Sequence, residues 1–353
     1  ITIAALLVAA SSLVSRLLGI FRDRILAGEF GAGDTLDIYY AAFRIPDLIF
    51  NLLVLGALSA GFVPIFVRLI EGPAAKLKGM FSDEAPAAAW RLANNVMNVL
   101  LASLVVLSVL GIVLADQLMF LIVPGFTPEK QALTADLSRI MFLSPLLLGL
   151  SSVVGGILQS FKRFFVYSLA PIAYNVGIIV GVLYFVPRWG VHGLAWGVVG
   201  GALLHLLVQI PLTIKLGWRY RPVFDLKNAD LRQIFKLMVP RTMSLAIAQI
   251  NLGVITVFAS TLKSGTLAVF NLANNLQSFP IGLFGLSFAV AAFPSLSAAA
   301  FDRRKLAESF STVFRQILFF VVPSTVLLLT LRAQIIRVIL GTGQFDWDDT
   351  VMT

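Results

Sequence analysis

The chain has 353 residues, of which 58% are hydrophobic and only 13% are charged. Soluble globular domains carry roughly 25% charged residues, so this composition excludes an ordinary soluble protein and indicates one that crosses a membrane many times. The absence of cysteine excludes disulfides and thiolate metal sites.

Long uncharged runs mark the predicted transmembrane helices in chain order. About 20 apolar residues span the ~30 Å hydrocarbon core of a bilayer. The runs that follow the apolar start of the chain are 48–67, 92–115, 140–161, 164–187, 189–214, 242–262, 264–301 and 316–331. Together they predict an all-α, polytopic membrane protein with about nine transmembrane helices.

Two arginines lie deep inside the first two predicted helices. Arg16 follows the uncharged stretch Ile1–Ser15, and Arg44 lies in the middle of the second helix, at about 36–70. A charge near the bilayer centre costs about 2.5–3.5 kcal/mol on insertion scales, so such residues normally face a protein interior or a water-filled cavity. The sequence therefore predicts a cavity that receives an anion.

A polar face runs along the second helix. Its members are Asp37, Tyr40, Arg44, Asp47 and Asn51. Because they recur at three- and seven-residue steps, they share one side of a helix and predict a binding site. The alternative is internal pairing, in which Asp37 or Asp47 neutralises Arg44. In the first helix, Asp23 shares a face with Arg16, whereas Arg22 lies near the helix end, where its side chain can reach the interface.

Two further helices carry asparagines at helical spacing. The sets are Arg91, Asn94, Asn95 and Asn98 in the third helix, and Asn271, Asn274, Asn275 and Ser278 in the eighth. In the third helix such a set predicts hydrogen bonds between helices. In the eighth helix, which pairs with the second under the repeat described below, a functional role is as strong an alternative. His205 and Gln209 share a face, and we expect structural packing there, with a proton relay as the alternative.

Lys and Arg are concentrated in alternate loops. The connections between helices 2–3, 4–5, 6–7 and 8–9 hold 17 of them, and the opposite side holds 7. Because cytoplasmic loops carry the excess of basic residues, the N-terminus and these four loops are predicted to be cytoplasmic. This topological role accounts for the net charge of +9 without a nucleic-acid partner.

The second and eighth helices are both long, and each contains two prolines. These are Pro46 and Pro64 in one helix, and Pro280 and Pro294 in the other. Because proline removes an internal hydrogen bond, each is expected to kink its helix and to act as a hinge. An offset of 230 residues aligns Pro64 with Pro294, which suggests two related lobes with a site between them, as in many transporters.

The loops and the repeat predict the domain organisation. Residues 1–216 would form an N-terminal lobe of helices 1–6, and residues 217–236 a cytoplasmic linker between the lobes. Residues 237–353 would begin a C-terminal lobe with helices 7–9. Because six helices are expected in that lobe, we expect the chain to be a fragment of a longer protein.

The sequence contains no Walker A motif, no His-Glu-x-x-His and no Gly-x-Ser-x-Gly. These motifs supply phosphate cradling, zinc ligation and a nucleophilic serine, respectively. We therefore expect neither enzyme activity nor a cofactor or metal.

Several segments carry a family resemblance. They read SRLLGIFRD at 15–23, FGAG at 30–33, AFRIPD at 42–47, GALS at 56–59, FVP at 62–64, FPIG at 279–282 and FPSLS at 293–297. In these segments, and in order along essentially the whole chain, the sequence resembles the MurJ (MviN) family of the multidrug/oligosaccharidyl-lipid/polysaccharide exporter superfamily. The resemblance implies two six-helix lobes around a central cationic cavity. It also implies flipping of lipid II, the undecaprenyl-pyrophosphate-linked peptidoglycan precursor.

The resemblance also implies site residues. Arg16, Arg22 and Arg44 would be cations of the family's cavity, and Asn275 stands where an arginine of helix 8 is common in the family. An acid that often precedes Gly56 is Leu55 here, so the cavity is expected to be less cationic than the family norm. The expected substrate-contacting residues are Arg16, Arg22, Asp37, Arg44, Asp47, Asn51 and Asn275.

We therefore expect a lipid-linked oligosaccharide flippase that moves lipid II across the bacterial inner membrane by alternating access. The alternatives are a flippase for another polyprenyl-linked glycan, a cation-coupled multidrug antiporter, and a non-transporting scaffold for cell-wall enzymes. The expected partners are a polyprenyl-pyrophosphate-linked glycan lipid, membrane lipids and cell-wall synthesis proteins.

Overall fold

The computed structural model describes residues 2–55, 61–71, 87–286, 288, 289, 292, 296 and 302–353. Within these ranges the regular secondary structure is helical and no strand occurs, which confirms the predicted all-α fold. The helices of this part that are long and apolar enough to cross a membrane are six: Ala87–Val113, Pro128–Ser160, Phe164–Trp189, His192–Lys215, Ala229–Ser260 and Arg304–Thr330. The total of about nine transmembrane helices stays a prediction.

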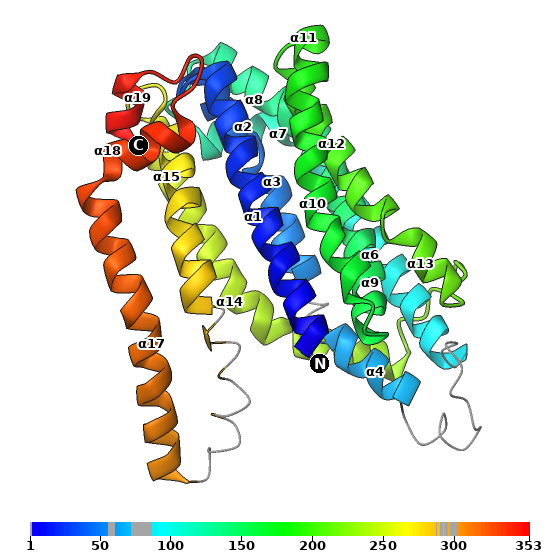
Figure 1. The fold of residues 1–353 in the computed structure, drawn as a ribbon. Helices are drawn as coiled ribbons and strands as arrows, with labels where there is room; N and C mark the ends of the chain where they lie inside the picture. Colours follow the sequence, from blue (N-terminus) through cyan, green and yellow to red (C-terminus); the bar gives the residue numbers. More distant parts are fainter. Residues whose placement is uncertain are drawn as a thin grey trace. The chain divides into compact units, whose positions relative to one another are not determined.

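The helices belong to two compact units, each formed by two stretches of the chain. The first unit comprises Ile1–Leu18 and Asp34–Leu267, and the second comprises Gly19–Gly33 and Ala268–Thr353. Helix α1 (Thr2–Phe30) contributes to both (Figure 1). The division into lobes of 1–216 and 237–353 with a linker between them stays a prediction.

The first unit holds most of the helices. After α1 these are α2 (Asp34–Ala42), α3 (Arg44–Phe50), η1 (Asn51–Leu55), α4 (Val63–Glu71), α6 (Ala87–Val113), α7 (Ala115–Ile122), α8 (Pro128–Met141), α9 (Leu143–Ser160), α10 (Phe164–Val180), η3 (Gly181–Phe185), α11 (Val186–Trp189), α12 (His192–Leu207), α13 (Ile210–Lys215) and α14 (Ala229–Ser260). An apolar core joins α4, α6 and α9, in which Phe62 and Phe66 are fully buried. Trp90 of α6 stacks on Phe161 at the end of α9, with the ring centroids 5.9 Å apart. This core holds the N-terminal end of α6 in place.

Helix α10 and the π-helix η3 that follows it pack closely against α12 through glycines (Figure 1). A Cβ atom on Gly177 would overlap the Cα of Gly201, and a Cβ atom on Gly181 would overlap the Cα of Gly197. Small residues at four-residue spacing allow two helix backbones to approach in a membrane, where hydrophobic burial does not drive association.

The second predicted helix is not one continuous α-helix in the described residues. It turns at Phe43, and Pro46 then lies in the first turn of α3, where its missing N–H costs little. The helix continues as the π-helix η1, and α4 begins with Pro64 as its second residue. Pro280 ends α15 (Thr266–Pro280), directly before the π-helix η4 (Ile281–Leu286). Pro294 lies outside the described residues, and the hinge role of these prolines stays a prediction.

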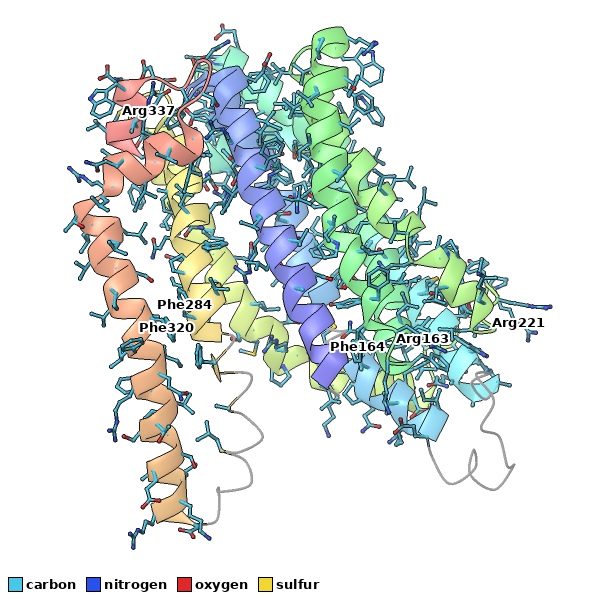
Figure 2. All side chains as sticks on the ribbon, viewed as in Figure 1. Arg163, Phe164, Arg221, Phe284, Phe320 and Arg337 are labelled. Atoms are coloured by element: carbon cyan, nitrogen blue, oxygen red, sulfur yellow. The ribbon has the colours of Figure 1, made fainter. Side chains whose placement is uncertain are left out.

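The second unit contains the end of α1 and the C-terminal helices. Besides most of α15 and η4, it has α17 (Arg303–Thr330), α18 (Arg332–Leu340) and α19 (Trp347–Met352). Phe284 of η4 stacks on Phe320 of α17, with the ring centroids 4.9 Å apart and the planes 8° from parallel (Figure 2). Arg337 of α18 donates from Nη1 to the carbonyl oxygen of Phe345 at 3.0 Å, which fixes the loop that leads to α19.

The helix bounds repeat along the chain with the predicted offset of 230 residues. Helix α1 ends at Phe30 and α14 ends at Ser260. The π-helices η1 and η4 begin at Asn51 and Ile281. Since π-helices are rare, their recurrence at the same place in both halves supports the internal repeat more strongly than the weak sequence identity does.

Candidate functional site

Arg16 lies on α1, is half-buried and belongs to the first unit. The neighbouring helix α10 fixes the backbone beside it, because Asn175 donates from Nδ2 to the carbonyl oxygen of Ser15 at 3.4 Å. The same amide donates to the carbonyl oxygen of Pro171 at 3.0 Å, so the Asn175 side chain is held by both helices. Arg16 is therefore carried on a positioned segment of α1.

The polar face of the second predicted helix is partly preserved. Arg44 begins α3 and is half-buried, whereas Asp47, one turn later, is exposed although its helix is apolar. The two charges interact electrostatically. Asn51 donates from Nδ2 to the carbonyl oxygen of Asp47 at 2.8 Å. Arg44, Asp47 and Asn51 are thus brought together, and the interaction of the two charges supports the internal-pairing alternative.

Asp37 lies in a different cluster, which we call the Lys130 cluster: Asp34, Asp37, Lys130, Ser264 and Gly265. Lys130 Nζ donates to Asp34 Oδ1 at 2.5 Å and to Asp37 Oδ2 at 3.0 Å. Ser264 Oγ donates to Asp34 Oδ1 at 2.5 Å, and Gly265 N donates to Asp37 Oδ2 at 2.8 Å. The hydrogen bonds from Lys130 and Ser264 hold the pKa of Asp34 below its usual value. Asp37 is thus held by Lys130 and Gly265, whereas Arg44 interacts electrostatically with Asp47 and Tyr40.

Arg22 and Asn275 meet through an acid in the second unit. Arg22 donates from Nε and Nη2 to Asp23 Oδ1 at 3.0 and 2.7 Å. Asn275 donates from Nδ2 to Asp23 Oδ2 at 2.9 Å. Because Asp23 is only 4% exposed, this is an inward-facing set rather than a surface contact. Arg22 therefore does more than reach towards the interface, and Asp23 partly neutralises its charge.

The asparagines of the third predicted helix bind a backbone rather than another helix. Asn94 donates to the carbonyl oxygen of Arg219 at 3.0 Å and accepts from the N–H of Arg221 at 3.1 Å. Asn95 likewise donates to the carbonyl oxygen of Asp225 at 2.8 Å and accepts from its N–H at 2.7 Å. An irregular segment cannot satisfy its own N–H and C=O groups, so side-chain amides do so here. The expectation of interhelical hydrogen bonds was wrong for these residues.

Asn98 completes this set, which we call the asparagine clamp (Asn94, Asn95 and Asn98). It donates from Nδ2 to the carbonyl oxygens of Arg221 and Val223 at 3.0 and 2.9 Å. Its Oδ1 accepts from the hydroxyl of Tyr220 at 2.9 Å. The signal for the clamp was present in the sequence as three asparagines on one helix face, but the identity of the bound segment was not.

His205 and Gln209 take part in a compact polar contact with α9. Ser151 Oγ lies 2.6 Å from His205 Nδ1, and Gln209 Nε2 donates to Ser151 Oγ at 2.6 Å. The hydroxyl of Ser151 also donates to the carbonyl oxygen of His205 at 3.0 Å. This arrangement joins α9 to α12, as expected for structural packing.

The chain was compared with families of known proteins and with their curated members. The family model described as lipid II flippase MurJ matches residues 26–353. A lipid II flippase MurJ from Burkholderia cenocepacia is 33% identical over 307 residues, which cover 85% of this chain and 57% of that protein. A probable lipid II flippase MurJ from Buchnera aphidicola subsp. Acyrthosiphon pisum is 30% identical over 352 residues, which cover 98% of this chain and 67% of that protein. The chain thus spans 57% and 67% of the lengths of these two relatives.

Solved structures have the same fold. A structure of lipid II flippase MurJ in an inward closed conformation matches with a TM-score of 0.79 and 25% identity, over 98% of this chain and 70% of that one. An inward-facing multidrug resistance transporter of the MATE family matches with a TM-score of 0.75 and 16% identity, over 99% of this chain and 78% of that one. The second match concerns the fold alone.

Proposed function

Because the chain belongs to the lipid II flippase MurJ family, we propose that it is part of a flippase for a polyprenyl-pyrophosphate-linked glycan, with lipid II as the substrate. The pyrophosphate-sugar head group is too polar to cross hydrocarbon unaided, so the protein supplies a polar path. The lipid tail can stay in the bilayer while alternating access moves the head group.

The observation that carries the proposal is the presence of two half-buried arginines, Arg16 and Arg44, in apolar helices. Arginine suits a pyrophosphate because its guanidinium is planar, permanently charged and able to donate two parallel hydrogen bonds. Arg44 has Asp47 as a counter-charge. We place the main phosphate contact at Arg16, because Asn175 positions the backbone beside it. Arg22, Asn51 and Asn275 are also proposed to contact the substrate.

Transport of lipid II by the full-length protein in liposomes tests this proposal. Arg16→Ala should reduce the rate at least about tenfold, since it removes a charge-assisted contact to phosphate. Arg188→Ala is the matched control, because Arg188 ends a helix and its side chain binds the carbonyl oxygen of Tyr184 in its own turn. Unchanged transport by Arg16→Ala would remove Arg16 from the site.

The same liposomes distinguish the alternative functions. Transport of a different polyprenyl-linked glycan in preference to lipid II would mean that this glycan is the substrate, moved by the same mechanism. Uptake of organic cations coupled to an ion gradient would favour the antiporter, for which the exposed carboxylate of Asp47 is the candidate cation site. If the protein transports none of these substrates, the remaining alternative is a non-transporting scaffold for cell-wall enzymes.

The location follows from the same proposal. The chain is a multi-pass membrane protein by its helices and its family. We place it in the bacterial inner membrane, with the N-terminus and the 217–236 segment in the cytoplasm. The 17-to-7 distribution of basic residues between the two sides supports this orientation.

A further inference from the structure

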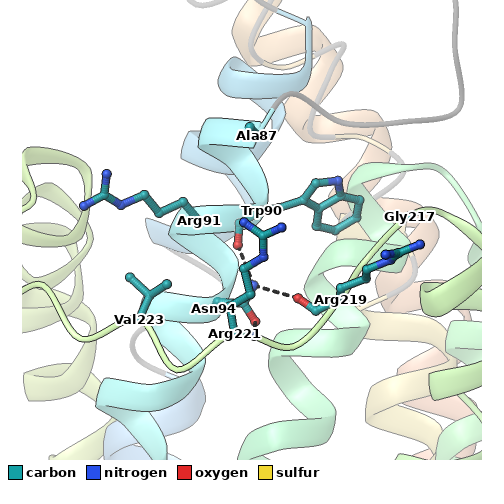
Figure 3. Close-up of a pocket in the computed structure, with 8 residues that line it drawn as sticks. All are labelled: Ala87, Trp90, Arg91, Asn94, Gly217, Arg219, Arg221 and Val223. Atoms are coloured by element: carbon teal, nitrogen blue, oxygen red, sulfur yellow. Dashed lines mark hydrogen bonds between the residues drawn. The ribbon is translucent and has the colours of Figure 1, made fainter.

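A basic pocket lies at the N-terminal end of α6, within the first unit (Figure 3). Its volume is about 460 Å³, within the range of about 300–1,000 Å³ that is typical of ligand pockets. It is lined by Ala87, Trp90, Arg91, Asn94, Gly217, Arg219, Arg221 and Val223. None of these residues belongs to the proposed transport site.

The asparagine clamp builds this pocket. Asn94 and Asn98 hold the main chain at Arg219, Arg221 and Val223, so every second residue of the segment lines the pocket. The clamp uses only main-chain atoms of Arg219 and Arg221, which leaves their guanidinium groups to a ligand. In Figure 3 the side chain of Arg221 rises between those of Arg91 and Arg219.

The pocket carries an excess of positive charge. Within the described ranges, the side chains of Arg219 and Arg221 make no hydrogen bond or ion pair, and Figure 2 shows Arg221 extending away from the ribbon. Arg91 faces one acid, Asp225, at 3.5 Å, where both side chains are substantially exposed and the pair is weak. Among the described residues, three arginines face one carboxylate, which favours an anion that accepts several hydrogen bonds, and phosphate does so.

The pocket lies at the level where lipid head groups are found. Ala87 and Asn94 fall in the first two turns of Ala87–Val113, which is long enough to cross a membrane, so the pocket is at one end of a span. Aromatic residues concentrate at this level in membrane proteins. Trp90 lines the pocket, and Tyr220 and Phe224 of the clamped segment are 56% and 59% exposed. Exposed aromatic side chains beside unpaired arginines suit a ligand that is both anionic and lipidic.

We propose that this pocket binds the phosphate head group of an anionic membrane phospholipid. The phosphate oxygens accept hydrogen bonds from Arg219 and Arg221, and Arg91 contributes at the edge. The glycerol and the first acyl carbons lie along Trp90. The site holds a resident lipid of the bilayer and does not depend on what the protein transports.

Native mass spectrometry of the purified full-length protein tests the proposal by counting bound lipids during titration with phosphatidylglycerol or phosphatidylcholine. The test variant is Arg219→Gln with Arg221→Gln, which keeps the main-chain atoms that the clamp holds. It should weaken the tightest phosphatidylglycerol binding at least about tenfold and leave phosphatidylcholine binding unchanged. Arg219→Lys with Arg221→Lys should lose less, because it keeps the charge but not the paired hydrogen bonds.

The control removes the same charge beside the pocket. Lys215→Gln with Lys227→Gln changes two exposed lysines of the same stretch that do not line it. Binding should change less than about twofold, because exposed charges that do not contact the ligand are screened by salt. An equal loss in the control, or no loss in the arginine variant, would overturn the proposal. Displacement of the lipid by glycerol phosphate at equal concentration would also overturn the proposal, because it would identify a site for a soluble phosphate. Each outcome is read from binding, so failure of lipid II transport cannot produce it.

Discussion

Lys130 is the residue whose structural role was least predictable from the sequence. It appears as one basic residue of a short loop, yet its side chain is 12% exposed and touches two carboxylates. Asp37, with a side chain that is 3% exposed, depends on that ammonium. A buried carboxylate that loses its cation keeps the desolvation cost without the compensating attraction.

We predict that Lys130→Met lowers the free energy of unfolding by about 3–5 kcal/mol, because it removes the ammonium group that pairs with the buried carboxylate of Asp37. Asp34→Asn should lower it by only about 0.2–1 kcal/mol, because that carboxylate belongs to an exposed ion pair. The Asp34 side chain is 63% exposed. Thermal unfolding of the two variants in the same detergent measures the difference. Equal losses would mean that Asp37 does not need Lys130.

The position of a charged residue deep within an apolar helix revealed some of the candidate site residues, but it did not reveal their partners. Arg16 and Arg44 could be selected because a charge in an apolar helix is rare. The pairing of Asp37 with Lys130 joins residues 93 apart, and that of Asn275 with Asp23 joins residues 252 apart. No local pattern encodes such contacts, because they follow from how the helices pack.

At the scale of elements, two asparagines of the clamp each protect a different backbone N–H group from hydrogen exchange. Asn94 protects the N–H of Arg221, and Asn95 protects the N–H of Asp225. We predict that Asn95→Ala accelerates hydrogen exchange at Asp225 and spares Arg221, while Asn94→Ala does the reverse. Each variant should also lose about 1–3 kcal/mol of stability through unsatisfied backbone groups.

Ser103→Ala is the control for the clamp variants. It removes a hydroxyl of the same helix that binds only the carbonyl oxygen of Val99, one turn away. Hydrogen exchange at the backbone amides of Arg221 and Asp225 should stay at the wild-type rate. If Asn94→Ala and Asn95→Ala accelerate both amides alike, the clamp opens as one unit and does not protect residue by residue.

The elements themselves were predictable to different degrees. Prolines in a long apolar run indicated the interruption of the second helix, and Pro46 lies just after its turn at Phe43. The π-helices η1 and η4 could not be predicted, because an extra residue in a turn is stabilised by packing and leaves no periodicity of its own. The bounds of the interrupted segments therefore came only from the structure.

At the scale of the whole molecule, the predicted orientation in the membrane can be tested by labelling in intact cells. A cysteine introduced by Asn228→Cys should resist an impermeant thiol reagent in intact cells, because the basic loops stay in the cytoplasm. Glu129→Cys, in an exposed position on the opposite side, should be labelled. The chain contains no cysteine of its own, so it adds no background. The reverse labelling pattern would invert the topology.

The fold as a whole was the most predictable feature. Length, uncharged runs and the family segments indicated an all-α membrane protein with a transporter fold, and the match to solved structures confirms the fold. The predicted 230-residue offset recurs in the ends of α1 and α14. The predicted lobes and linker were drawn from loop polarity. The compact units divide α1 between them, which loop polarity cannot anticipate, and the predicted lobes stay a prediction.

Apart from the hydroxyl of Tyr220, the asparagine clamp binds main-chain atoms of the segment, so most side chains of the segment do not affect its hydrogen bonds. The amides of Asn94, Asn95 and Asn98 would grip the 219–225 segment equally well with other residues at Arg219, Arg221 and Val223. Proline alone is excluded at Arg221 and Asp225, whose N–H groups are used, while Pro222 occupies a position where none is required. Substitution of Arg219 and Arg221 can therefore change the charge of this pocket while the clamp still holds the same main-chain path.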